Sequence, residues 1–183
     1  TMLLDNGVDL HSYQPTAEDI MQISQCDLFI YVGGESDAWV EDALKEAVNK
    51  NMRVINLLDV LKDTIKEEEV VEGMQAEEEE GDEEEGDEEE EEPEYDEHVW
   101  LSLRNAETLC QSIEKALAEL NPSAASNYEN NLNQYLSKMK DLDQKYQEVV
   151  NDGKNKTLLF GDRFPFRYLV DDYNLKYYAA FVG

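Results

Sequence analysis

The sequence is poor in positive charge. Its 183 residues include 15 Lys and Arg against 44 Asp and Glu, so the formal net charge is −29. A chain this acidic repels nucleic-acid phosphates and anionic lipid, and we exclude nucleic acid as a partner. It also lacks the run of about 18 apolar residues that a membrane-spanning helix needs, so we expect no direct membrane insertion. Because Asp5 follows the first apolar residues at once, we expect no signal peptide. We interpret the chain as a fragment of a longer one, because no strand or cap precedes residues 2–4 and the strand-like run over 176–182 stops at Gly183.

Cysteine and histidine are equally scarce. The two cysteines, Cys26 and Cys110, lie in apolar contexts without a CxxC spacing, which argues against a redox motif or a zinc finger. Two buried thiols are favoured over a disulfide. The two histidines, His11 and His98, lack an HExxH context and a nucleophile set. A metal-dependent hydrolase is therefore disfavoured, and we expect no enzyme.

The negative charge is concentrated in one segment. Residues 67–97 hold 21 acids and no Lys or Arg, which leaves 23 acids against 15 bases in the rest. A segment of Glu, Asp and Gly cannot bury enough surface to order itself, so we predict disorder over about 66–94. Its oxygens suit weak accumulation of cations near a site, or the segment has no function. The alternative function, of another class, is an acidic protein-interaction module in which this run binds a basic partner.

The apolar pattern elsewhere alternates between strand and helix. Thr16 and Ser36 are predicted helix caps. Two β-α-β steps in the first half predict an α/β fold with a parallel sheet covered on both faces, whose ligands lie outside the carboxyl ends of the strands. The predicted strands are 27–32, 52–57, 156–160 and 175–181, and the predicted helices are 16–25, 39–49, 102–120, 123–151 and 164–173.

The helix over 123–151 is long enough, at roughly 40 Å, to bridge two lobes. We therefore predict an N-terminal α/β lobe over 1–122, a connecting helix over 123–152, and the beginning of a second α/β lobe over 153–183. The two histidines precede helices, at the junctions where an α/β sheet binds its ligand. His11 has Asp9 nearby, and His98 has Asp96 and Glu97, as acids that can orient an imidazole bound to a metal.

Four segments, taken in order, resemble the zinc-binding solute-binding proteins of bacterial metal ABC importers. The segments are GVDLHSYQPT over 7–16, DLFIY over 27–31 with Trp39, DEHVWLS over 96–102, and LLFGDRFPFRYL over 158–169. The resemblance covers essentially the whole chain. It includes a charged insertion just ahead of the second histidine.

The resemblance implies two α/β lobes joined by one long helix, with a metal ion between them. His11 and His98 would be nitrogen ligands. The family usually supplies a third histidine where this chain has Asp162, which is either an oxygen ligand or part of an ion pair with Arg163. The implied cargo is Zn²⁺, with Mn²⁺ as the alternative because mixed nitrogen and carboxylate ligands hold both.

The resemblance also implies high-affinity zinc capture outside the cytoplasmic membrane and delivery to a membrane permease of an ABC importer. The implied location is the periplasm or the cell surface, with a lipid anchor on the full-length protein. A manganese-binding protein and a cell-surface adhesin are the alternatives within the same family.

Overall fold

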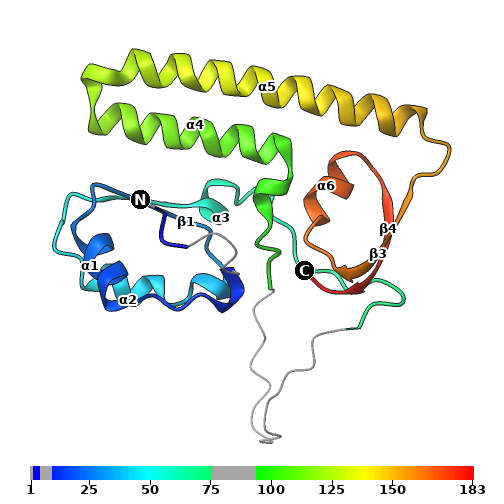
Figure 1. Cartoon of the computed structure of the whole chain (residues 1–183), viewed down its shortest axis with the longest axis horizontal. Helices are drawn as coiled ribbons and strands as arrows, with labels where there is room; N and C mark the ends of the chain where they lie inside the picture. Colours follow the sequence, from blue (N-terminus) through cyan, green and yellow to red (C-terminus); the bar gives the residue numbers. More distant parts are fainter. Residues whose placement is uncertain (1, 5–9, 76–93) are drawn as a thin grey trace, which may run out of the picture. The chain divides into compact units, whose positions relative to one another are not determined.

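The structure, a computed structural model, describes residues 2–4, 10–75 and 94–183. The chain divides into two compact units, one formed by residues 1–63 and 107–136, the other by residues 64–106 and 137–183. Figure 1 labels the elements of each unit. This grouping differs from the sequential division at residues 122 and 152, which stays a prediction. The predicted α/β class is confirmed, because each unit contains a pair of parallel strands with helices.

The first unit is built around a parallel strand pair. Strand β1 (Leu28–Tyr31) pairs with β2 (Arg53–Asn56), in a register that sets Leu28 opposite Arg53. The other elements are the 3-10 turns η1 (Leu10–Ser12), η2 (Glu35–Asp37) and η4 (Pro122–Ala124), the helices α1 (Ala17–Gln25), α2 (Val40–Lys45) and α3 (Leu57–Val60), and parts of α4 (Leu103–Leu120) and α5 (Ala125–Asp152). Within this unit, the turn at η4 connects α4 to α5, and the two helices run side by side (Figure 1).

Local sequence signals explain the first helix of this unit. Thr16 caps α1 through a reciprocal pair of bonds with Asp19: the Thr16 hydroxyl accepts the Asp19 N–H, and the Asp19 carboxylate accepts the Thr16 N–H. The helix then buries Ile23 against Phe29 of β1 and Val40 of α2. Thus the predicted cap and helix are confirmed.

Two predictions in this unit are wrong. Helix α2 ends at Lys45 and does not reach residue 49, because the N–H groups of Val48 and Asn49 donate to the carbonyl of Ser24 in α1, at 3.0 and 2.9 Å. These tertiary bonds replace a further helical turn. Ser36 is not a helix cap either. It lies inside η2, and its hydroxyl contacts His11 instead.

The second unit contains the other parallel strand pair, β3 (Thr157–Arg163) and β4 (Lys176–Phe181). Helix α6 (Arg167–Asp172) connects the two strands, and η3 (Val99–Leu101) leads into α4. One face of the pair packs on a core of Phe164, Val170 and Ala179. On the other face, Leu159 is 83% exposed and Tyr178 is 48% exposed.

The long helix is confirmed. Helix α5 spans 28 residues, and it begins in the residues of the first unit and ends in those of the second. Both cysteines are free thiols and half-buried. Burial raises the pKa of both the Cys26 and the Cys110 thiol, which keeps them protonated near neutral pH.

Candidate metal centre

In the first unit, His11 lies beside the loop that follows strand β1. It is part of η1, and its Nδ1 atom is 3.0 Å from the hydroxyl of Ser36 in η2. The buried Asp37 carboxylate fixes this loop by accepting the N–H groups of Val32 and Gly33, at 2.9 and 3.0 Å. His11 is thus held at the carboxyl end of β1, where an α/β sheet binds its ligand.

The loop depends on a glycine. Gly33 has a φ of +94°, a conformation that side-chain-bearing residues rarely adopt. A Cβ atom at this position would lie 2.5 Å from the Oδ1 atom of Asn56, the last residue of β2. Asn56 in turn caps α3, because the same Oδ1 accepts the N–H of Asp59 at 3.2 Å. The end of β2 and the loop carrying Ser36 therefore pack against each other through the bare glycine.

In the second unit, His98 is largely buried, with 12% of its side chain exposed. Its Nδ1 atom lies 3.2 Å from Oδ1 of Asp96, which also accepts the His98 backbone N–H at 2.8 Å. A Cβ atom built on Gly183 would lie 3.3 Å from that same Nδ1. Trp100 follows His98 by two residues, and the centroids of the two rings are 5.6 Å apart.

Gly183 also relates His98 to the strands of this unit. It follows β4 by two residues, and its carbonyl accepts a hydrogen bond from the guanidinium of Arg163, the last residue of β3, at 3.5 Å. His98 therefore lies at the carboxyl ends of β3 and β4. In each unit separately, the candidate histidine occupies the position that the α/β architecture reserves for ligands.

Asp162 lies near the end of β3 and is exposed. Its carboxylate accepts the backbone N–H of Arg163 at 2.9 Å. Within residues 2–4, 10–75 and 94–183, no group of three or more His, Cys, Asp or Glu side chains comes together in a way that could hold a metal ion. The assignment of His11, His98 and Asp162 as ligands stays a prediction.

The segment that leads into His98 is ordered, contrary to the prediction of disorder from residue 66. Residues 66–68 pair antiparallel with residues 94–96: the Glu68 N–H donates to the Glu94 carbonyl, and the Asp96 N–H donates to the Lys66 carbonyl, both at 2.9 Å. We call these two short segments the stem. The rest of the predicted disordered run, 76–93, lies outside the described residues.

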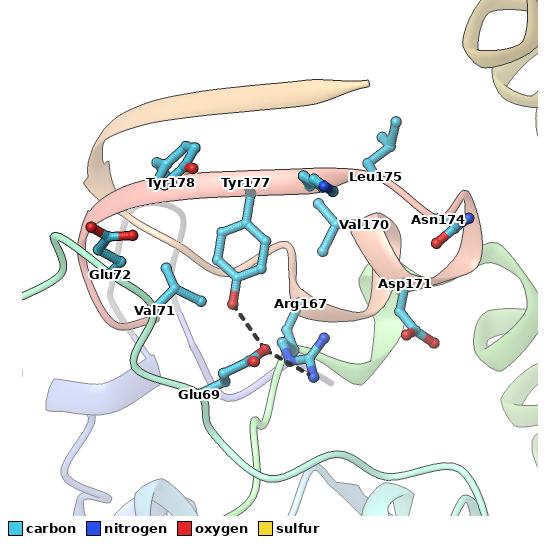
Figure 2. Close-up of a pocket in the computed structure, with 11 residues that line it drawn as sticks. Glu69, Val71, Glu72, Arg167, Val170, Asp171, Asn174, Leu175, Tyr177 and Tyr178 are labelled. Atoms are coloured by element: carbon cyan, nitrogen blue, oxygen red, sulfur yellow. Dashed lines mark hydrogen bonds and ion pairs between the residues drawn. The ribbon is translucent and has the colours of Figure 1, made fainter. Parts of the chain in front are cut away.

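Two ion pairs and a hydroxyl fasten the first part of this segment to α6 and β4. Lys66 pairs with Asp171 at 2.9 Å, and Glu69 pairs with Arg167 at 3.1 Å. Figure 2 shows the Tyr177 hydroxyl pointing at the same Glu69 carboxylate, to which it donates at 3.4 Å. Of these residues, Glu69, Arg167, Asp171 and Tyr177 line a cavity of about 470 Å³ beside α6 and β4. None of the predicted ligands that the structure describes lines this cavity.

Tyr168 of α6 contacts both sides of the stem, including Asp96, the residue that holds His98. Its hydroxyl donates to the Asp96 carbonyl at 2.7 Å and accepts the Lys66 N–H at 3.2 Å. Burial raises the pKa of this phenol to about 12, so the hydroxyl keeps its proton and remains a donor at neutral pH.

Sequence reasoning identified one of the two groups that hold the histidines. Asp96 was an expected partner of His98 because it is two residues away, and the contact is present. Asp9 lies outside the described residues. Ser36 was missed, since it is 25 residues from His11. Its place in the loop that follows a buried strand was the one available signal.

The comparisons with known proteins agree with this architecture. The chain matches the ZnuA family, described as "Zinc-uptake complex component A periplasmic", over residues 1–182. It is 31% identical to the high-affinity zinc uptake system protein ZnuA of Bacillus subtilis, covering 96% of this chain and 51% of that protein. It is 32% identical to the zinc-binding lipoprotein AdcA of Streptococcus pneumoniae, covering 97% of this chain and 33% of that protein.

Among solved structures, Zn(II)-bound AdcA from Streptococcus pneumoniae is similar with a TM-score of 0.73 and 26% identity, over 97% of this chain and 33% of that one. The chain thus spans between a third and a half of the length of these relatives. In the part of the chain that the structure describes, no helix is both long and apolar enough to span a membrane. The family match over nearly every residue, on a fold shared with the solved relatives, establishes that the chain belongs to the ZnuA family of zinc-uptake components.

Proposed function

We propose that this chain captures zinc and hands it to the membrane permease of an ABC importer, without chemical turnover. The observation that carries the proposal is the placement of a histidine at the carboxyl ends of the strands in each unit, in a chain of the ZnuA family. The names of the relatives support zinc as the cargo, since they are called zinc-binding or zinc-uptake proteins. The family description, which contains the word periplasmic, supports a location outside the cytoplasmic membrane.

The ligands we propose are His11 and His98, with Asp162 as a further oxygen ligand. Imidazole binds Zn²⁺ as a neutral ring, with Zn–N distances near ~2.0–2.1 Å. Each histidine already has a partner for its Nδ1 atom, Ser36 for His11 and Asp96 for His98. Such a partner orients a ligating imidazole and makes it a better donor, which supports the assignment of these two rings.

Isothermal calorimetry tests the site directly. We expect the 183-residue chain to bind one zinc ion, and His11→Ala and His98→Ala each to weaken binding at least tenfold. Asp162→Asn should weaken it less. Asp152→Asn, which removes an exposed carboxylate at the end of α5, is the matched control and should have no effect. Zinc binding that survives both histidine substitutions would refute the proposed site.

Manganese is the competing cargo. Because two imidazoles favour Zn²⁺ over Mn²⁺ in the general order of affinities, we expect zinc to displace manganese in a competition titration. Stronger retention of manganese would reassign the cargo to Mn²⁺ and leave the ligand assignment intact.

The acidic run needs a deletion that spares the stem. Removing residues 67–93 would also remove one side of the stem, so the informative deletion is 76–93. If the run concentrates cations near the site, its deletion should slow zinc association at low salt and have less effect at high salt. An unchanged association rate would mean that the run has no part in zinc capture. Salt-sensitive binding of basic proteins that is indifferent to zinc would instead favour the acidic interaction module.

A further inference from the structure

The thiol of Cys26 lies against a second sulfur atom. Its Sγ atom donates a hydrogen bond to the Sδ atom of Met52 at 3.4 Å. Cys26 is the C-cap residue of α1, two residues before β1, and Met52 directly precedes β2. Both side chains are half-buried and pack against the core of Ile23, Phe29 and Val40. The first unit thus places a thiol and a thioether side by side, partly open to solvent.

The starts of the two strands hold this sulfur pair together. Because β1 and β2 run parallel, the residues just before them meet at one edge of the sheet, and the Arg53 N–H donates to the Asp27 carbonyl at 2.9 Å. The Asn49 side chain donates to the Cys26 carbonyl at 2.9 Å, and the Asn49 carbonyl accepts the Met52 N–H at 3.3 Å. The backbone beneath both sulfur atoms is therefore fixed by bonds that need no ion.

This edge is not the one that holds the candidate zinc ligand of the same unit. His11 lies at the carboxyl end of β1, whereas Cys26 and Met52 lie at the amino ends of β1 and β2. The donor atoms differ as well. A structural zinc ion takes four ligands, commonly thiolate, imidazole or carboxylate, whereas a thiolate with a thioether selects a soft ion such as Cu⁺.

We propose that Cys26 and Met52 form a site for a soft monovalent metal ion, Cu⁺, bound between the thiolate and the thioether. Binding breaks the S–H bond of Cys26, forms a bond from each sulfur to the ion, and releases one proton to solvent without electron transfer. Two metal–sulfur bonds of about 2.3 Å span at most about 4.6 Å, and the flexible Met52 side chain can open the 3.4 Å contact to this length. The site does not depend on zinc capture.

The second cysteine supplies a matched control. Cys110 is also a half-buried free thiol, but the described lining of its groove between α4 and α5 includes no methionine. We therefore compare Cys110→Ser, which keeps the sulfur pair, with Cys26→Ser, which keeps only the other thiol. The probe is Ag⁺, which shares the preference of Cu⁺ for sulfur and is not oxidised in air.

A titration of Ag⁺ against a competing sulfur chelator measures the difference. We expect Cys110→Ser to bind Ag⁺ about tenfold or more tightly than Cys26→Ser, because only the first has two sulfur donors. Equal affinities would overturn the proposal. Cu⁺, titrated without oxygen against a coloured chelator, should give the same order, and a preference confined to Ag⁺ would overturn the assignment of Cu⁺.

The thioether is tested by adding Met52→Leu to the Cys110→Ser chain. This change nearly conserves side-chain volume, and we expect it to lower the Ag⁺ affinity to that of Cys26→Ser. Met21→Leu removes an exposed thioether of α1 and should have no effect. Carbon-13 NMR of the methionine methyl groups gives a readout that does not depend on the folding of Met52→Leu. If Cys110→Ser binds Ag⁺ and no methyl resonance shifts, the thioether is not a ligand and the proposal is wrong.

The sulfur site and the zinc site fail independently. Neither sulfur is a proposed zinc ligand, so Cys26→Ser should keep the zinc affinity of wild type, and excess Zn²⁺ should not displace the bound Ag⁺. Displacement by Zn²⁺ would overturn the assignment of a soft ion. If no chain binds zinc while Cys110→Ser binds Ag⁺ through both sulfur atoms, the capture function fails and the sulfur site stands.

Discussion

Replacing Tyr168 by Phe removes one hydroxyl that satisfies two backbone groups, one buried and one partly buried. Tyr168 is 2% exposed, and its oxygen serves both the Asp96 carbonyl and the Lys66 N–H. Leaving a buried polar group without its partner costs about 1–3 kcal/mol, and the Lys66 bond is the longer one, so we expect a loss of about 2–4 kcal/mol. For a chain of this size that corresponds to a fall of roughly 5–15 °C in unfolding temperature.

Thermal unfolding followed by circular dichroism measures this loss, and hydrogen exchange locates it. We expect the amide protons of Lys66 and Asp96 to exchange faster in Tyr168→Phe than in wild type. The matched control is Tyr178→Phe, which removes the same atom from a side chain that is 48% exposed, and should cost less than about 0.5 kcal/mol. If both variants unfold at the same temperature, the Tyr168 hydroxyl does not support the stem and our reasoning is wrong.

Three further perturbations probe other parts of the chain. In a urea titration, Gly33→Ala should lower the free energy of unfolding by more than about 1 kcal/mol, since it adds a Cβ against Asn56 at a positive φ. The control is Gly73→Ala, which has a φ of +92° and open space around it and should cost less. Thr16→Ala should cost about 1 kcal/mol through loss of the α1 cap, and amide exchange confined to α1 would report it. Because burial raises the pKa of Cys26, its thiolate forms at higher pH in the folded chain, so iodoacetamide at pH 8 should label the folded chain more slowly than the urea-unfolded one. Equal labelling rates would contradict that burial.

The elements that could be read from the sequence are those whose signals are local. The capping pair of Thr16 and Asp19 lies within one helical turn, and the stripe of α5 repeats over 28 residues. Both were found. The end of α2 was missed, because Val48 and Asn49 keep the apolar and polar pattern of a helix while their N–H groups bond to Ser24, more than twenty positions earlier.

In the candidate site, too, the contact between sequence neighbours was predicted and the contact between distant residues was missed. The contact between Asp96 and His98 spans two residues and was expected, whereas that between Ser36 and His11 spans 25 and was not. Residues 66–68 and Glu94 of the stem were mistaken for part of a disordered run, because composition averages over a segment and does not register a pairing between residues 66–68 and 94–96. Composition and periodicity do not predict contacts between residues that are far apart in the sequence.

The stem also makes the intervening sequence replaceable. Since residues 66–68 and 94–96 are joined to each other and to α6, the residues between Gln75 and Glu94 can change in number without moving Asp96. Closing a loop costs entropy that grows only slowly with its length, about 0.6 kcal/mol for each doubling. We therefore expect this position to tolerate length variation, so that a foreign sequence such as a histidine-rich tract or a fluorescent reporter can be inserted there.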